Sequence, residues 1–168
     1  DIVIDAVALK GTDICETNKE LARKINVEGT QNIIDACKLF DPFFVFISTA
    51  FVFDGRKPIY TEDDIPNPVN YHGQTKLQGE KIVSNSGLPY VIARLDQLYG
   101  WPMSKSGENT VTKVLGKLKN GEDVYEIIDW YNNPTLVDNA VEIISKLVKK
   151  QRTGIYHIVG SSFLNRVE

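Results

Sequence analysis

The sequence lacks the features that mark several broad classes of protein. No apolar run approaches the roughly 20 residues that a membrane-spanning helix needs. It has only two cysteines, Cys15 and Cys37, with no CxxC motif and no nearby pair of histidines. This excludes a disulfide scaffold, argues against a cysteine-based zinc site and favours a reducing cytoplasm. With 19 basic and 22 acidic residues, the net charge of −3 predicts no general attraction to nucleic acid or to an anionic membrane.

What is present suits a folded domain. The chain has 168 residues, of which 42% are hydrophobic and 24% are charged. A chain of this length buries roughly 70% of its unfolded surface, enough for one core. However, it begins without Met, directly in a strand-like run, DIVIDAVA, and ends in SSFLNRVE, which resembles the start of a helix. These two ends predict a piece of a longer protein.

Hydrophobic patterning predicts alternating strands and helices. The expected strands cover residues 1–8, 43–49, 90–95, 124–128 and 155–159, and the first two are expected to be buried. The expected helices cover residues 17–40, about 73–84, 110–119 and 136–150. Thr17 is the expected N-cap of the helix at 17–40. The expected inward face of that helix consists of Leu21, Ile25, Ile33, Ile34 and Cys37. The expected inward face of the helix at 136–150 consists of Val137, Val141, Ile144 and Val148. Residues 54–70 and 99–109 are expected loops. The alternation predicts an α/β fold with a largely parallel sheet.

Small or polar residues follow the ends of three expected strands. They include Asp5, Ser48, Thr49 and the segment that starts at Arg94, and ligands of open α/β sheets bind at this edge. On the next helix, His72, Lys76 and Glu80 are spaced four apart and share one face. A hydroxyl, a proton donor and a lysine together suit the reduction of a carbonyl group.

Six segments, in order, resemble one family. Residues 47–55 resemble STDYVFDG, 25–30 resemble VNVxGT, 67–81 resemble NPxNxYGxTKLxGEK, 94–100 resemble RxxxLYG, 133–138 resemble sPTxVxD, and 154–157 resemble GxYHxxG. The chain is thereby similar to the extended short-chain dehydrogenases/reductases. The resemblance is strongest to the dTDP-4-dehydrorhamnose reductase-like branch, which includes the regulatory β subunit of methionine adenosyltransferase.

The resemblance implies a Rossmann-type, doubly wound, mostly parallel sheet that lacks its N-terminal βαβαβ half and its C-terminal end. None of the 12 glycines forms the family's phosphate-binding motif, GxGxxG or GxxGxxG. We therefore expect a single α/β domain fragment over residues 1–168. Residues 1–100 would be the rest of the Rossmann core, and residues 101–168 mixed core and a partial substrate lobe.

The implied activity is NAD(P)H-dependent reduction of a 4-keto group on a nucleotide-activated sugar. By resemblance, Thr49 steadies the oxyanion, Lys76 binds the nicotinamide ribose, His72 or Tyr71 supplies the proton, and Asn26 lies near the water path. The expected cofactor-binding residues are Asp5, Ala6, Val7, Ser48, Lys76 and Arg94. The choice between NADP and NAD stays open, binding by so short a chain is in question, and no metal is expected. The expected partner is a small nucleotide sugar, and a homodimer stays open.

Several positions depart from the family pattern. The proton-donor tyrosine of YxxxK is replaced by His72, and Tyr71 precedes it by one residue, about 140° around a helix from Lys76. A distorted helix start could bring Tyr71 into place. Ala50, Phe51 and Gln97 replace residues that hold substrate in the reductase branch. These departures favour an alternative function, a non-catalytic regulatory or binding protein that keeps the fold.

Each candidate residue also has a structural interpretation. Ser48 and Thr49 could cap a turn, and Lys76 could be a solvated surface charge. Arg94 could pair with a buried carboxylate, and Asn26 could be incidental. We interpret His157, inside the last expected strand, as a core histidine, and both cysteines as structural thiols.

Overall fold

A computed structural model describes residues 1–102 and 109–167 of the chain. The chain divides into two compact units. The first unit joins Asp1–Arg94 to Lys146–His157, and the second joins Leu95–Ser145 to Ile158–Glu168. The expected division near residue 100 stays a prediction.

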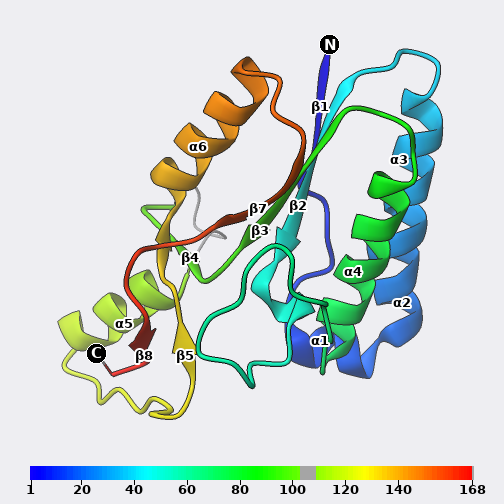
Figure 1. Ribbon diagram of the computed structural model, residues 1–168. Helices are drawn as coiled ribbons and strands as arrows, with labels where there is room; N and C mark the ends of the chain where they lie inside the picture. The colour runs from blue at the N-terminus through cyan, green and yellow to red at the C-terminus, as the bar shows by residue number, and fades with distance from the viewer. Residues whose placement is uncertain (103–108, 168) are drawn as a thin grey trace. The chain divides into compact units, whose positions relative to one another are not determined.

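A four-stranded sheet forms the centre of the first unit. Its strands are β1 (Ile2–Asp5), β2 (Phe43–Thr49), β3 (Tyr90–Leu95) and β7 (Gly154–Ile158), in the order β1-β2-β3-β7 (Figure 1). Strands β1 and β2 pair in parallel, with Ile2 opposite Phe43. A parallel sheet flanked by helices confirms the predicted α/β class.

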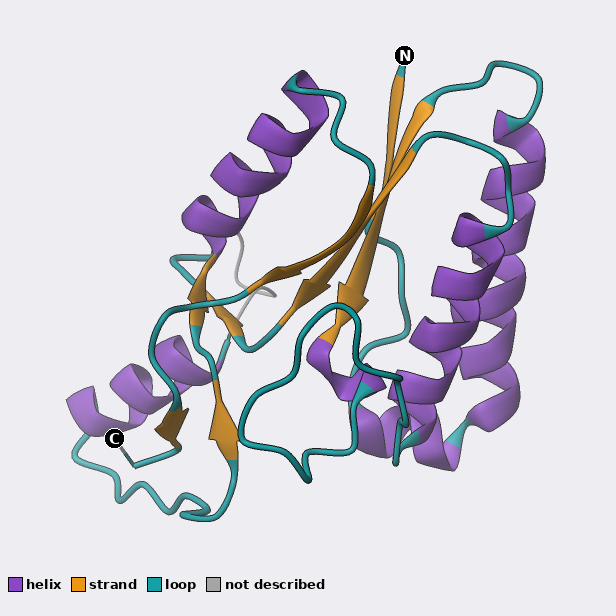
Figure 2. Ribbon diagram, viewed as in Figure 1, coloured by secondary structure: helices purple, strands orange, loops and turns teal. Residues whose placement is uncertain are grey.

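Helices α1 (Thr12–Thr17), α2 (Lys19–Arg23), α3 (Gly29–Cys37) and α4 (Tyr71–Ser84) accompany this sheet (Figure 2). A π-helical turn, Lys24–Glu28, joins α2 to α3. The prediction of a helix that starts at Thr17 was wrong. Thr17 ends α1, and its hydroxyl donates to the carbonyl of Asp13 instead of capping a new helix. Helix α4 starts at Tyr71 because the Asn70 side chain accepts the backbone N–H of Gly73.

The inward face of α2 and α3 differs from the predicted one. Ala22, Asn26, Thr30 and Ile34 are buried at intervals of four, whereas Leu21 is 46% exposed. The reason is that this stripe packs close to α4, where Asn26 bonds Thr75, so small and polar side chains fit better than large apolar ones.

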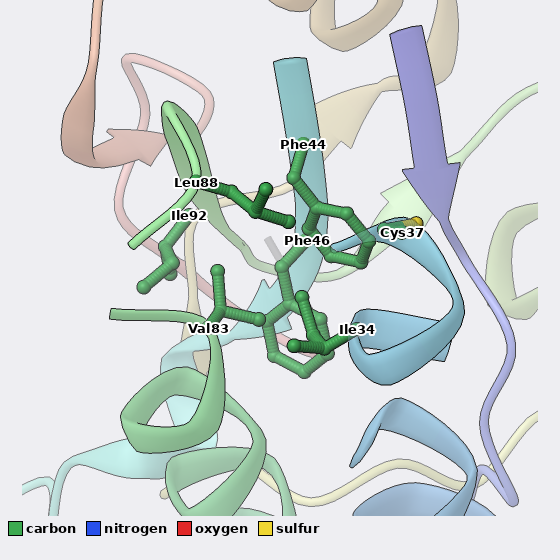
Figure 3. Close-up of a cluster of buried hydrophobic side chains, with 7 residues drawn as sticks. All are labelled: Ile34, Cys37, Phe44, Phe46, Val83, Leu88 and Ile92. Carbon is green, nitrogen blue, oxygen red and sulfur yellow. The ribbon is translucent and has the colours of Figure 1, made fainter. Parts of the chain in front are cut away.

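The hydrophobic core lies between β2, β3 and the helices α3 and α4. It consists of buried side chains from these elements and the loop before β3, shown in Figure 3: Ile34, Cys37, Phe44, Phe46, Val83, Leu88 and Ile92. Helix α4 approaches β2 closely at Gly79, where an added Cβ would lie 2.5 Å from the ring of Phe46. The continuous apolar run of β2 is explained by burial on both of its faces.

Strand β1 is shorter and more exposed than predicted. It ends at Asp5, whose carboxylate accepts the backbone N–H of Val7 and so turns the chain out of the ladder. Ile2 and Ile4 are more than half exposed because β1 is an edge strand of the sheet.

The second unit contains short strands and the helix α5 (Thr110–Lys119). Strand β4 (Leu98–Tyr99) pairs in parallel with β6 (Thr135–Leu136), and β5 (Tyr131–Asn132) pairs antiparallel with β8 (Leu164–Asn165). The predicted strand at residues 124–128 is absent from the described chain. Tyr125, Ile127 and Ile128 are exposed there, and no strand pairs with them. Residues 164–165 form β8, so the expected start of a helix at 161–168 was also wrong.

Helix α6 covers Val137–Lys149, close to the predicted bounds. Its buried face is Ala140, Ile144 and Val148, whereas Val141 is 56% exposed. The predicted face was therefore wrong at Val141, because the stripe runs in steps of four through the small Ala140. Part of the expected loop at 99–109 lies outside the described residues.

Candidate functional site

The candidate site lies where β2 ends and α4 begins. A 3₁₀ turn, Ala50–Val52, follows Thr49, and α4 packs on this turn. Gly73 allows the contact, because an added Cβ would lie 2.0 Å from the carbonyl oxygen of Phe51. The same approach sets the ring of His72 edge-on to Phe51, with centroids 6.0 Å apart. The first turn of α4 is thereby held beside the end of the strand that carries Thr49.

Lys76 is a buried ammonium group on the inner face of α4. It is 3% exposed, and its Nζ lies 3.9 Å from the centroid of the Phe46 ring. Burial lowers the pKa of Lys76 to about 8, although the carboxylates of Asp5 and Glu80 act to raise it. Within residues 1–102 and 109–167, no side chain accepts a hydrogen bond from Nζ. The interpretation as a solvated surface charge is therefore wrong, and the ammonium can donate to the oxygens of a ligand.

Thr49 combines a structural contact with a free donor. Its Oγ1 accepts the backbone N–H of Phe51 at 3.2 Å and so caps the 3₁₀ turn. Its hydroxyl proton has no acceptor in the part of the chain that the structure describes. Ser48 differs, because it is buried and its hydroxyl donates to Oε1 of Glu80. Of the two hydroxyls, only that of Thr49 is available to a ligand carbonyl.

His72 occupies the position of the predicted proton donor, and its surroundings favour the neutral ring. Burial, followed by the charge of Lys76, lowers the pKa of His72, and the carbonyl of Leu9 acts to raise it. The ring nitrogen Nδ1 lies 3.8 Å from the thiol of Cys15, whose own pKa burial raises. At neutral pH, His72 is thus a hydrogen-bonding group with no acidic proton to give.

Tyr71 does not join this arrangement. The ammonium of Lys19 lies 5.3 Å from the centroid of its ring, and its backbone N–H donates to Glu16 at 2.6 Å. Helix α4 is regular from Tyr71 onward. Because Lys76 follows Tyr71 by five residues, the two side chains lie on different faces of the helix. The distorted helix start that could have brought Tyr71 into place is not observed, and the catalytic assignment of Tyr71 is corrected.

Asn26 is fully buried and holds the chain after β1. Its Oδ1 accepts the backbone N–H of Leu9 at 2.7 Å, and its Nδ2 donates to the Leu9 carbonyl and to Oγ1 of Thr75. Asn26 lies in the π-helical turn, and such turns recur at functional sites. Asn26 therefore connects residues 6–10 to α4.

The residues predicted to meet the cofactor after β1 differ in exposure. Asp5 is 2% exposed and accepts hydrogen bonds from Val7 and Thr30, so it shapes the turn and faces Lys76 as a charge. Ala6 and Val7 are exposed and open to a ligand.

Arg94 forms a buried ion pair with Glu80. Its Nη2 and Nε lie 2.7 Å and 3.0 Å from the two carboxylate oxygens, and both side chains are at most 5% exposed. The predicted cofactor contact of Arg94 is therefore corrected in favour of the alternative, a buried carboxylate partner. Glu80 was found on the face of Lys76 from its spacing, but the sequence did not show that it joins α4 to β2 and β3.

Among the described residues, no group of three or more histidine, cysteine or acidic side chains could hold a metal ion. Both cysteines are free and buried, as predicted. No helix in the same residues is long and apolar enough to cross a membrane.

The parallel α/β sheet with its helices is that of an extended short-chain dehydrogenase/reductase. The family described as the RmlD substrate binding domain matches residues 1–168, and the chain belongs to this family. The predicted resemblance is confirmed.

Relatives and solved structures agree with this assignment. The methionine adenosyltransferase 2 subunit beta of Rattus norvegicus is 30% identical over 99% of this chain and 52% of its own length. The dTDP-4-dehydrorhamnose reductase of Sinorhizobium fredii is 27% identical over 96% of this chain and 56% of its own length. The structure of the dTDP-4-dehydrorhamnose reductase from Bacillus anthracis in complex with NADP is 32% identical, with a TM-score of 0.92 over 98% of this chain and 57% of that chain. The chain thus spans about half the length of the curated relatives it matches.

Proposed function

We propose that this chain is the part of a nicotinamide-dependent reductase that binds the nicotinamide end of the cofactor and a nucleotide-activated 4-keto sugar. The single observation that supports the proposal best is the buried Lys76 ammonium, one turn after His72 and without an acceptor among the described residues. A buried cation of this kind needs partner oxygens, because an unpaired charge away from water is costly. The two hydroxyls of a nicotinamide ribose would supply them.

The residues fit such a cofactor at one end only. Ala6 and Val7 are exposed directly after Asp5, whereas the glycine-rich turn that holds a pyrophosphate is absent from this sequence. When bound, the reduced nicotinamide supplies the hydride. The hydroxyl of Thr49 would donate a hydrogen bond to the carbonyl oxygen as charge develops on it. Lys76 would hold the ribose and keep a positive charge near that oxygen.

The proton that the reduction needs is not supplied by His72 at neutral pH. Because the pKa of His72 is lowered, its ring would hydrogen-bond the carbonyl and not protonate it at neutral pH. The charge that remains at neutral pH belongs to Lys76, whose pKa of about 8 makes it mostly protonated there. In the proposal, His72 therefore orients the carbonyl group by a hydrogen bond and is not the proton donor that the family pattern places at this position.

The proposal also covers the cytoplasmic location, the small-molecule partner and the homodimer that the sequence suggested. The relatives whose structures carry NADP or NAD leave the cofactor open between the two.

The first test measures binding of NADPH and NADH to the full-length protein by calorimetry. We expect Lys76→Met to weaken binding at least ~10-fold, because one charge-assisted contact contributes about 1.5–3 kcal/mol. The matched control is Lys81→Met, which removes an exposed lysine from the same helix and should leave affinity unchanged. Equal affinities in wild type and Lys76→Met would contradict the assignment of Lys76.

A second candidate function is a non-catalytic regulatory subunit. It is favoured by the neutral His72 and by the placement of Tyr71 against Lys19. The discriminating assay follows NAD(P)H oxidation with a dTDP-4-keto sugar by wild type and by His72→Tyr. Turnover in either supports the reductase. No turnover in both, with nicotinamide binding retained, would exclude the reductase and leave the regulatory function.

A further inference from the structure

A buried carboxylate lies near the buried ammonium of the candidate site without forming an ion pair with it. Asp5 ends β1, and its register partner on β2 is Phe46, the residue whose ring Lys76 covers. Residues paired across neighbouring strands point to the same face of a sheet, and the strands are about 4.8 Å apart. The side chain of Phe46 points into the core between β2 and the helices (Figure 3). Asp5 therefore lies on the face of the sheet that Lys76 meets.

Hydrogen bonds from neutral donors hold Asp5 on this face. Its Oδ2 accepts the hydroxyl of Thr30 on α3 at 3.2 Å, and its Oδ1 accepts the backbone N–H of Val7 at 3.1 Å. In the chain that the structure describes, no cation forms an ion pair with Asp5. Because Asp5 is 2% exposed, water screens its charge very little.

Lys76 has the complementary property. Its ammonium lies 3.9 Å from the centroid of the Phe46 ring, and no described residue forms an ion pair with it. A buried ammonium without a partner tends to lose its proton. The charge of Asp5 raises the pKa of Lys76 more than the charge of Glu80 does, and burial brings it down to about 8. Asp5 is thus the stronger of the two carboxylates that oppose this loss.

The other charged groups around Lys76 are paired or neutral. Glu80, one turn later on α4, is bound by Arg94 from β3, with Nη2 and Oε2 2.7 Å apart. His72, one turn earlier on α4, has its pKa lowered by burial and by the charge of Lys76, so its ring is neutral at pH 7. Among the described residues, the charge of Asp5 is therefore the one that balances Lys76.

We propose that Asp5 is the counter-charge of Lys76, a carboxylate that keeps the ammonium ionised from the neighbouring strand and leaves its N–H groups free for a ligand. A contact ion pair would use one of those donors. Asp5 is in this sense a positioning residue, since it acts through Lys76 and needs no contact with the ligand. The inference rests on the proposed function for the identity of the ligand, but the charge of Lys76 can be measured without one.

The first test follows the titration of Lys76 by NMR in the full-length protein with ¹³C-labelled lysine, its signal assigned from Lys76→Met. We expect a midpoint of about 8 in the wild type. Asp5→Asn keeps the shape of the side chain and removes its charge, so the midpoint should fall by about one pH unit. An unchanged midpoint in Asp5→Asn would overturn the proposal.

Thr30→Val is the matched control, because it removes a hydrogen bond from Asp5 and leaves the carboxylate in place. The midpoint of Lys76 should not fall in this variant. A fall as large as that in Asp5→Asn would assign the effect to the lost hydrogen bond and would rule out the role of the charge.

The second test measures NADPH binding by wild type and Asp5→Asn at pH 6 and pH 8. At pH 6 Lys76 is mostly protonated in both proteins, so their affinities should agree within about twofold. At pH 8 about half of the wild-type ammonium remains, against about a tenth after a fall of one unit, so Asp5→Asn should bind about fivefold more weakly. Equal weakening at both pH values would show a merely structural role and contradict the proposal.

A wild-type measurement keeps the proposal testable if Asp5→Asn does not fold. As the pH rises from 7 to 9.5, the carboxyl ¹³C signal of Asp5 should shift with the same midpoint as Lys76, because the carboxylate senses the loss of the neighbouring charge. A carboxyl signal that stays constant while Lys76 titrates would argue decisively against the counter-charge. If NADPH does not bind while both titrations behave as expected, the proposed function fails and the counter-charge stands.

Discussion

Single side chains decide which of the sequence-based assignments hold. Lys76 changes from a residue that sequence patterns usually place at the surface to a buried ammonium. Arg94 changes from a candidate ligand of the cofactor to the partner of Glu80. Both outcomes follow from what packs against α4, and neither residue's type nor its spacing contains that information. His72 keeps its predicted position, but its neutral state weakens its predicted role.

The buried pair gives a stability prediction at this scale. Glu80→Ala should destabilise the first unit by about 3–5 kcal/mol, because it leaves the Arg94 guanidinium buried without its carboxylate. Urea unfolding followed by circular dichroism measures the change. The control, Asp35→Ala, breaks the exposed Lys38 pair and should have little effect. Equal effects of the two substitutions would show that the buried pair is not structurally important.

Helix α4 is the element on which the site depends. It contacts the 3₁₀ turn through Gly73, β2 through Gly79 and the π-helical turn through Thr75. Its predicted start at Gly73 was two residues late, since the sequence did not show that Asn70 acts as the cap. The bounds of β2, β3 and α5 were predicted from the sequence, because continuous apolar runs and flanking prolines or glycines mark them.

The close approach at Gly79 gives the prediction at the element scale. Gly79→Ala should cost about 1–3 kcal/mol, because its Cβ would meet the Phe46 ring at 2.5 Å inside a packed core. Gly116→Ala in α5 is the matched control, since nothing lies within 4 Å of the added Cβ. The control should stabilise its helix by up to about 1 kcal/mol. Thermal unfolding distinguishes the two, and a neutral Gly79→Ala would mean that α4 can move away from β2.

At the scale of the whole molecule, two histidines with lowered pKa values couple stability to pH. In the unfolded chain both titrate near 6.5, whereas in the folded chain both titrate below this value. Just below pH 6.5 the unfolded state therefore binds more protons, and the free energy of unfolding rises with pH. The contribution of the neutral rings is complete above this value and declines as pH falls through it.

Urea titrations at pH 7.5 and 5.5 should show a lower free energy of unfolding at the acid pH. The double variant His72→Phe with His157→Phe should reduce this difference, because the carboxylates with lowered pKa values titrate at more acid pH. Lys76 and Asp96, whose pKa values burial lowers and raises respectively, remain in the double variant. A pH dependence that is unchanged in the double variant would assign it to other groups.

The sequence by itself determined the α/β class, the family, and the presence of Thr49, His72 and Lys76 near one strand end. It could do so because strand periodicity, loop composition and ordered motifs are local properties of the chain. Only the tertiary structure decided that Lys76 is buried, that Arg94 pairs with Glu80, that Tyr71 lies against Lys19 and that the backbone N–H of His157 bonds Glu62. These outcomes depend on contacts between residues 14 to 95 positions apart or on which face of a helix is covered. Burial and pairing set the charge of each group, and both are properties of the packed fold.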